Sequence, residues 1–114
     1  GFTLLSGVAS LIELFAGFDF AITGGGVTPL EAAASGLPCM VIANEIHEIQ
    51  IGRYLEQRGC ALFAGYYKNM NPGRIKEAEA AGKIREMSER GLKTVDLSGA
   101  ERIYEIMFPE RKGL

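Results

Sequence analysis

Three consecutive glycines, Gly24–Gly26, separate an apolar run from the sequence Thr28-Pro29-Leu30-Glu31. A glycine has no Cβ, so a ligand can approach its backbone closely and positive φ angles cost little. Where such a loop leads from a strand into a helix, the amide groups at the helix start can bind an anion. The candidate phosphate-binding residues are therefore Gly24, Gly25, Gly26, Val27 and Thr28.

The same residues also fit a capping box, which needs no ligand. Thr28 would be the N-cap, Pro29 the first helical residue and Glu31 the third. The chain repeats this box at 98–101 (Ser-Gly-Ala-Glu), before another predicted helix and without a glycine run. The capping residues alone therefore indicate no ligand, and a phosphate site and a capped turn both remain open.

A second candidate is the segment Asn44–Gln50, which follows the next predicted strand. The carboxyl ends of parallel strands meet at one sheet edge, so this segment should lie beside the glycine loop. His47 is the only histidine and the one candidate catalytic residue, as a general base or a sugar ligand. A solvated loop histidine is the alternative. Position 51 is Ile, so the segment is no H-E-x-x-H zinc motif.

The glycine loop also has to be compared with a dinucleotide fingerprint. After Gly24-x-Gly26, the fingerprint needs a third glycine where this chain has Pro29. The fingerprint also has a ribose-binding acid roughly 20 residues after its glycines, and Glu45 lies at about that position. The missing glycine disfavours a nicotinamide cofactor.

Composition and charge limit what the chain can bind. The 114 residues are 47% hydrophobic and 23% charged, as expected for one folded domain spanning 1–114. The net charge is -2 and residues 1–52 contain no Lys or Arg, so nucleic-acid binding is not expected and backbone amides would have to hold an anion.

Cys39 and Cys60 lie in apolar runs, which favours free thiols in a reducing cytoplasm. We expect neither a signal peptide nor a membrane span.

Short apolar runs alternate with helical patterns along the first half of the chain. We expect strands at 2–5, 19–23, 39–43 and 60–63, and helices at 8–16, 29–35 and 48–58 between them. A polar helical stretch should run from about 71 to 90 with a break near Gly82, and a last helix should cover 98–108. This alternation predicts an α/β fold with a parallel sheet.

Several of these residues together resemble the C-terminal nucleotide-sugar-binding domain of GT-B glycosyltransferases. The matching elements are Asp19-x-Ala21-Ile22, Gly25-Gly26-x-Thr28-x-x-Glu31 and Gly36-x-Pro38, followed by a helix ending in Gly59. The stretch 85–107 is similar to the closing segment of that family. The resemblance covers nearly the whole chain. It looks most like the MurG-type N-acetylglucosaminyltransferases and the PseG-type UDP-sugar hydrolases, including spore-coat polysaccharide homologues. It implies a partial Rossmann-like sheet flanked by helices, the C-terminal half-domain of a GT-B fold.

The resemblance also implies roles for individual residues. In that family the glycine loop and the helix start bind the diphosphate, and the Glu of the motif binds ribose; here Glu31 would do so. Many members carry Gln eleven residues before the helix-ending glycine, where this chain has Glu48, with Gln50 two residues later. His47, Glu48 and Gln50 would then contact the donor, whose identity this departure leaves open.

The implied function is the binding of a UDP- or CMP-linked sugar, as part of a glycosyltransferase or nucleotide-sugar hydrolase in cell-surface polysaccharide or glycoconjugate synthesis. No metal or cofactor is implied. Such enzymes bind the acceptor in an N-terminal domain, which the sequence lacks together with the first strands of its own domain. We therefore expect an inactive isolated chain with an open edge at strand 19–23, which invites a homo-oligomer or a partner chain. The alternative is a non-catalytic subunit or interaction module.

Overall fold

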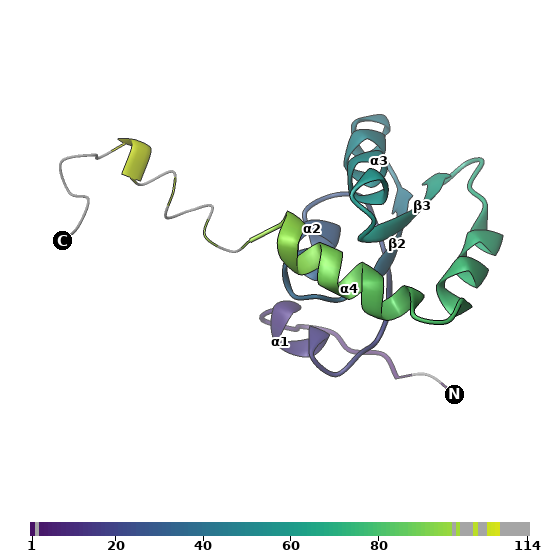
Figure 1. Ribbon diagram of the computed structural model, residues 1–114, viewed down its shortest axis with the longest axis horizontal. Helices are drawn as coiled ribbons and strands as arrows, with labels where there is room; N and C mark the ends of the chain where they lie inside the picture. The colour runs from purple at the N-terminus through teal and green to yellow at the C-terminus, as the bar shows by residue number, and fades with distance from the viewer. Residues whose placement is uncertain (2, 97, 99–101, 103–104, 108–114) are drawn as a thin grey trace.

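The computed structural model describes residues 1, 3–96, 98, 102 and 105–107. It contains a three-stranded parallel sheet in the order β1-β2-β3 (Figure 1). Strand β2 pairs with both neighbours, and Cys39 lies opposite Ala21 on one side and Ala61 on the other. The predicted α/β class, with a partial Rossmann-like parallel sheet flanked by helices, is confirmed. The strands are β1 Ala21–Thr23, β2 Cys39–Ala43 and β3 Ala61–Tyr66.

Helical segments connect the strands and follow the last of them. Figure 1 shows α4 beside α2, and α3 beside β3. The α-helices are α1 Ile12–Phe15, α2 Thr28–Ala34, α3 Ile49–Gln57 and α4 Lys83–Thr94; the 3₁₀ segments are η1 Ile46–Glu48 and η2 Pro72–Glu79.

The residues of β2 divide between the two faces of the sheet. Val41 packs in the cluster that contains Leu55 of α3, and Met40 packs with Met87 of α4 in a second cluster. Successive side chains of a strand point to opposite faces, so helices cover β2 from both sides. This arrangement explains why the run 39–43 is apolar throughout.

Helices α2 and α4 approach each other closely because small residues lie between them. A Cβ on Gly91 would lie 2.7 Å from the backbone oxygen of Ala33, so this position of α4 accepts only glycine without a shift. Gly36, which ends α2 with a φ of +75°, lies under Ser88 and Leu92 of α4. The two glycines thus allow α4 to dock against the end of α2.

Two predicted elements at the N-terminus are wrong or too long. Residues 3–5 form no strand and are exposed, and Phe2 lies outside the described residues. The helix expected at 8–16 is reduced to α1, which has no buried residue. Val8 and Leu11 are 40% and 43% exposed, so the apolar face of the expected helix has little to pack against.

The predicted capping box at the start of α2 is also wrong. The helix begins at Thr28 itself, Val27 is the N-cap residue, and no side chain caps it. The Val27 carbonyl accepts the amides of Leu30 (3.0 Å) and Glu31 (3.1 Å), so the helix starts one residue earlier than the box requires. The comparison box at 98–101 lies outside the described residues except for Ser98.

Other boundaries agree more closely. Gly59 and Gly82 have φ angles of +78° and +76°; Gly59 follows α3, and Gly82 divides η2 from α4 as predicted. Strand β3 runs to Tyr66, three residues beyond its predicted end at Phe63. The helix expected at 98–108 falls largely outside the described residues.

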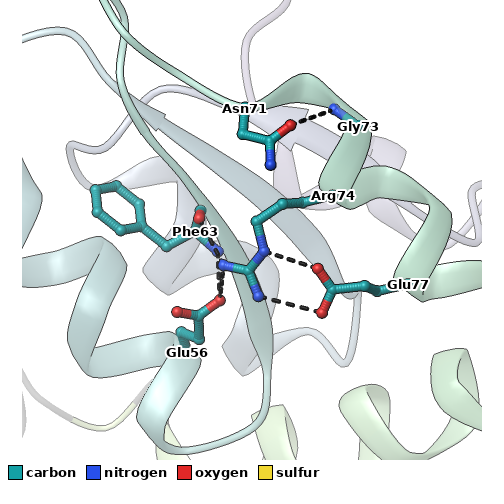
Figure 2. A network of polar contacts seen from close by, with 6 residues as sticks. All are labelled: Glu56, Phe63, Asn71, Gly73, Arg74 and Glu77. Carbon is teal, nitrogen blue, oxygen red and sulfur yellow. Dashed lines mark hydrogen bonds and ion pairs between the residues drawn. The ribbon is translucent and has the colours of Figure 1, made fainter.

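The two edges of the sheet differ. At the β3 edge, Arg74 of η2 donates to the Phe63 carbonyl (2.8 Å) and pairs with Glu56, whose carboxylate accepts the Phe63 amide at 3.0 Å (Figure 2). Arg74 also forms a two-bond contact with Glu77 (2.7 and 3.2 Å). Side chains therefore satisfy the outer backbone groups of Phe63, which blocks further strand pairing there.

Strand β1 has no comparable cover in the described part of the chain. It pairs only with β2, and Ile22 at its centre is 57% exposed. Nearby Phe18, just before β1, is 59% exposed. The open edge predicted for this strand is therefore present in the structure.

Within the described residues, no helix is long and apolar enough to cross a membrane.

Candidate functional site

Three loops leave the carboxyl ends of the three strands, where open α/β sheets bind their ligands. The glycine loop follows β1, the segment Asn44–Glu48 follows β2, and Tyr67–Met70 follows β3. The expected neighbourhood of the first two loops is confirmed by their contacts.

The glycine loop packs directly on the segment after β2. A Cβ on Gly24 would lie 2.9 Å from Nδ2 of Asn44, and one on Gly25 would lie 2.6 Å from Cβ of Glu48. A Cβ on Gly26 would come no closer than 3.7 Å to Oε2 of Glu48, an ordinary contact. Gly25 is thus required by packing between the loops, whereas the exposed Asn44 side chain can turn away from a Cβ at position 24 and Gly26 leaves space.

The carboxylate of Glu48 lies in a group of backbone amides. It accepts hydrogen bonds from the amides of Asn44 (2.8 Å) and Glu45 (3.3 Å), and the Gly25 amide is close by. The Asn44 amide is the main cause of the lowered pKa of Glu48. The amides of Glu45 and Gly25 and the nearby His47 lower it further, against partial desolvation. The loops therefore form an environment that stabilises a negative charge.

Glu45 and Glu48 form the capping box of this region, one that sequence analysis missed. The Glu45 side chain accepts from the backbone at Glu48, and the Glu48 side chain accepts from the Glu45 amide. The spacing of three residues is the usual one, but the N-cap residue is Glu instead of Ser, Thr, Asp or Asn. Because the N-cap residue is Glu, the sequence pattern of a capping box did not identify this one.

Some amides of the glycine loop remain available. Among the described residues, the amides of Gly26, Val27 and Thr28 donate no hydrogen bond to another protein group. The Leu30 amide, in contrast, is used inside the helix start. The part of the predicted phosphate site that is open to a ligand is therefore Gly26 to Thr28, next to the Glu48 carboxylate.

The remaining predicted residues lie in the segment after β2 and in the first turns of α2 and α3. His47 is exposed in η1, and Gln50 is exposed in the first turn of α3. Glu31 lies in the first turn of α2, partly buried. None of the three has a side-chain hydrogen bond to another described residue. The structure thus assigns no general base, and His47 remains a candidate.

Cysteine chemistry does not contribute to the site. Cys39 and Cys60 are free and buried in the core, as predicted for thiols in apolar runs. Burial raises the pKa of Cys39 to about 12, so its thiolate is scarce at neutral pH.

Two hollows in the surface lie elsewhere. One, of about 720 Å³, is lined by Phe18, Pro38 and the segment 78–82, and therefore lies at the amino ends of β1 and β2. The other, of about 400 Å³, lies between Arg58, which follows α3, and Arg90 of α4. The glycine loop lines neither of them.

Comparisons with protein-family models, with curated proteins and with solved structures found no match to this chain.

Proposed function

We propose that this chain binds a nucleotide-sugar, UDP- or CMP-linked, at the carboxyl edge of its sheet. The observation that carries the proposal is the carboxylate of Glu48, which already lies against the amides of Asn44, Glu45 and Gly25. A site that stabilises a carboxylate in this way has the right polarity for a phosphate. The charge would be met by backbone amides, since no Lys or Arg occurs in residues 1–52.

In this proposal the diphosphate binds at the amides of Gly26, Val27 and Thr28. Glu48 has to turn away, because two negative groups at this distance repel each other. Glu31, His47 and Gln50 would then contact the rest of the donor. The amides would stabilise the diphosphate as the anomeric C–O bond breaks, in transfer to an acceptor or in hydrolysis. We infer that catalysis needs an acceptor domain or partner chain that completes the cleft.

Gly26 offers a sharp test because its replacement spares the loop packing. We expect Gly26→Ala to fold normally, since the new Cβ makes only ordinary contacts. It should nevertheless weaken UDP binding at least severalfold by crowding the phosphate. Calorimetric titration with UDP, CMP and UDP-N-acetylglucosamine measures this. A wild-type chain that binds none of them contradicts the proposal.

The second candidate function is an interaction module, favoured by the difference between the two sheet edges. Arg74 and Glu56 cover the β3 edge, whereas β1 presents an uncovered edge and an exposed Ile22. A homo-oligomer or a partner chain could extend the sheet at β1. This role is compatible with nucleotide-sugar binding, because strand pairing would use the backbone of β1, whereas the phosphate would bind at the loop that follows it.

A further inference from the structure

The loop after β3 is held firmly by the backbone. The Tyr67 amide donates to the Ala43 carbonyl (2.9 Å), and the Asn71 amide donates to the Ala64 carbonyl (2.8 Å). Gly65 has a φ of +112°, and a Cβ there would lie 3.5 Å from the Cα of Met70. The strand pairing shifts register at this point, and such bulges often re-aim side chains beside functional sites.

This firm loop presents an aromatic side chain and a cation. Tyr67 is 48% exposed, and its ring packs edge-on against Tyr66 with the centroids 4.9 Å apart. The Nζ atom of Lys68 lies 5.8 Å from the centre of the Tyr67 ring. A side chain held in this way loses little conformational entropy when a ligand covers it.

The aromatic pair adjoins the segment after β2. Tyr66 pairs with Ala43, the last residue of β2, which lies two positions before Glu45. Desolvation is the main cause of the raised pKa of Tyr66, and Tyr67 and the charge of Glu45 add to it. Glu45 in turn belongs to the capping box that holds Glu48 beside the glycine loop. The three loops thus form one continuous edge.

Lys68 supplies a positive charge, which the other two loops lack. The glycine loop and the segment Asn44–Glu48 contain no Lys or Arg, whereas Lys68 lies two residues after the end of β3. The ends of β1 and β3 are separated by two strand spacings, about 10 Å. A nucleoside diphosphate is long enough to reach across this distance.

We propose that Tyr67 and Lys68 form the nucleobase end of the candidate site. The base stacks on the exposed ring of Tyr67, and the Lys68 ammonium attracts the phosphate next to the ribose, while the terminal phosphate lies at the glycine loop. This inference rests on the proposed function and adds the residues that would distinguish a nucleotide from a bare diphosphate.

The test is calorimetric titration of the full chain with UDP and with inorganic pyrophosphate, which has no base. We expect Tyr67→Ala to weaken UDP binding about tenfold and to leave pyrophosphate binding unchanged, because only the stacking is lost. Tyr67→Phe keeps the ring and should bind UDP like the wild type. Lys68→Met should weaken UDP binding, and the loss should shrink as salt is added.

The chain offers a matched control in Tyr54 of α3 and Arg58, which follows that helix. They form a second tyrosine–cation pair, with the guanidinium carbon 5.4 Å from the ring centre. Tyr54→Ala should leave UDP binding unchanged. If Tyr67→Ala binds UDP as tightly as the wild type, or weakens UDP and pyrophosphate equally, the nucleobase role is refuted while the proposed function stands. If the wild type binds neither compound, the proposed function and this inference fail together.

Discussion

At the scale of single residues, Glu48 occupies the space beside the glycine loop. Its carboxylate satisfies the amides of Asn44 and Glu45, and its Cβ packs against Gly25. The same side chain therefore stabilises the segment after β2 and repels any anionic ligand. These two effects have opposite signs and can be measured separately.

The effect on ligand binding follows from the charge. Glu48→Gln keeps the shape and an oxygen acceptor but removes the repulsion, so we expect UDP to bind severalfold more tightly than to the wild type. Calorimetry at low ionic strength measures the change. Glu13→Gln makes the same change in net charge in α1 and should have no effect; equal affinities for all three proteins would contradict the proposed competition.

The effect on stability depends on pH. Because the pKa of Glu48 is lowered in the folded chain, its ionised form stabilises the fold at pH values above the ordinary value of about 4.3. This stabilisation is lost as the pH falls through the lowered pKa. Glu48→Gln should therefore unfold at a lower temperature than the wild type at pH 7, and the gap should close on acidification. A gap that is independent of pH would refute this assignment.

At the scale of elements, Arg74 joins η2 to α3 and β3 (Figure 2). The hydrogen bond to Glu77 is the main cause of the raised pKa of Arg74, so the guanidinium stays charged. Arg74→Met should lower the free energy of unfolding by about 2 kcal/mol, because the Phe63 carbonyl and the Glu56 carboxylate lose a charged donor. Urea denaturation measures the change.

The chain contains a control for this prediction. Arg85 and Glu89 form an ion pair of 3.3 Å on α4, with side chains 87% and 60% exposed. Arg85→Met should change the free energy of unfolding by less than about 0.5 kcal/mol. Equal losses for Arg74→Met and Arg85→Met would show that the network at the β3 edge has no special role.

The contact between α2 and α4 predicts whether replacing Gly91 by alanine stabilises or destabilises the fold. Replacing glycine by alanine inside an exposed helix stabilises it by up to about 1 kcal/mol. Gly91→Ala should instead destabilise the fold by about 1–3 kcal/mol, because its Cβ would press on the Ala33 carbonyl of α2. Thermal unfolding distinguishes the two signs, and stabilisation would mean that α4 can move away from α2 at little cost.

At the scale of the whole molecule, one edge of the sheet is covered and the other is open. If β1 pairs with a second copy, light scattering should show a mass that rises with concentration in the micromolar range. Ile22→Lys should shift this equilibrium to the monomer, since a charge on an edge strand opposes pairing. Leu4→Lys, at a position 88% exposed and outside the sheet, should not. A wild-type chain that stays monomeric throughout would contradict pairing between copies.

The sequence by itself determined where the three strands lie and where several of the helices end. The run 39–43 is apolar at every position because β2 is buried on both faces, and glycines at 59 and 82 mark breaks because they adopt positive φ. Such signals are local, so each can be recognised within a few residues of the chain. These local signals also predicted that the glycine loop and the segment after β2 lie together at the carboxyl edge of the sheet.

Only the tertiary structure decided which groups those loops use. Glu48 meets Gly25 across a gap of 23 positions, and Arg74 meets Glu56 across 18, so neither partner is visible in a local pattern. The capping box expected at Thr28 is replaced by one at Glu45, because the Val27 carbonyl already starts α2. The strand expected at 2–5 failed for a related reason. Backbone groups need a neighbouring strand to pair with, and an apolar run of a few residues does not say whether one is there.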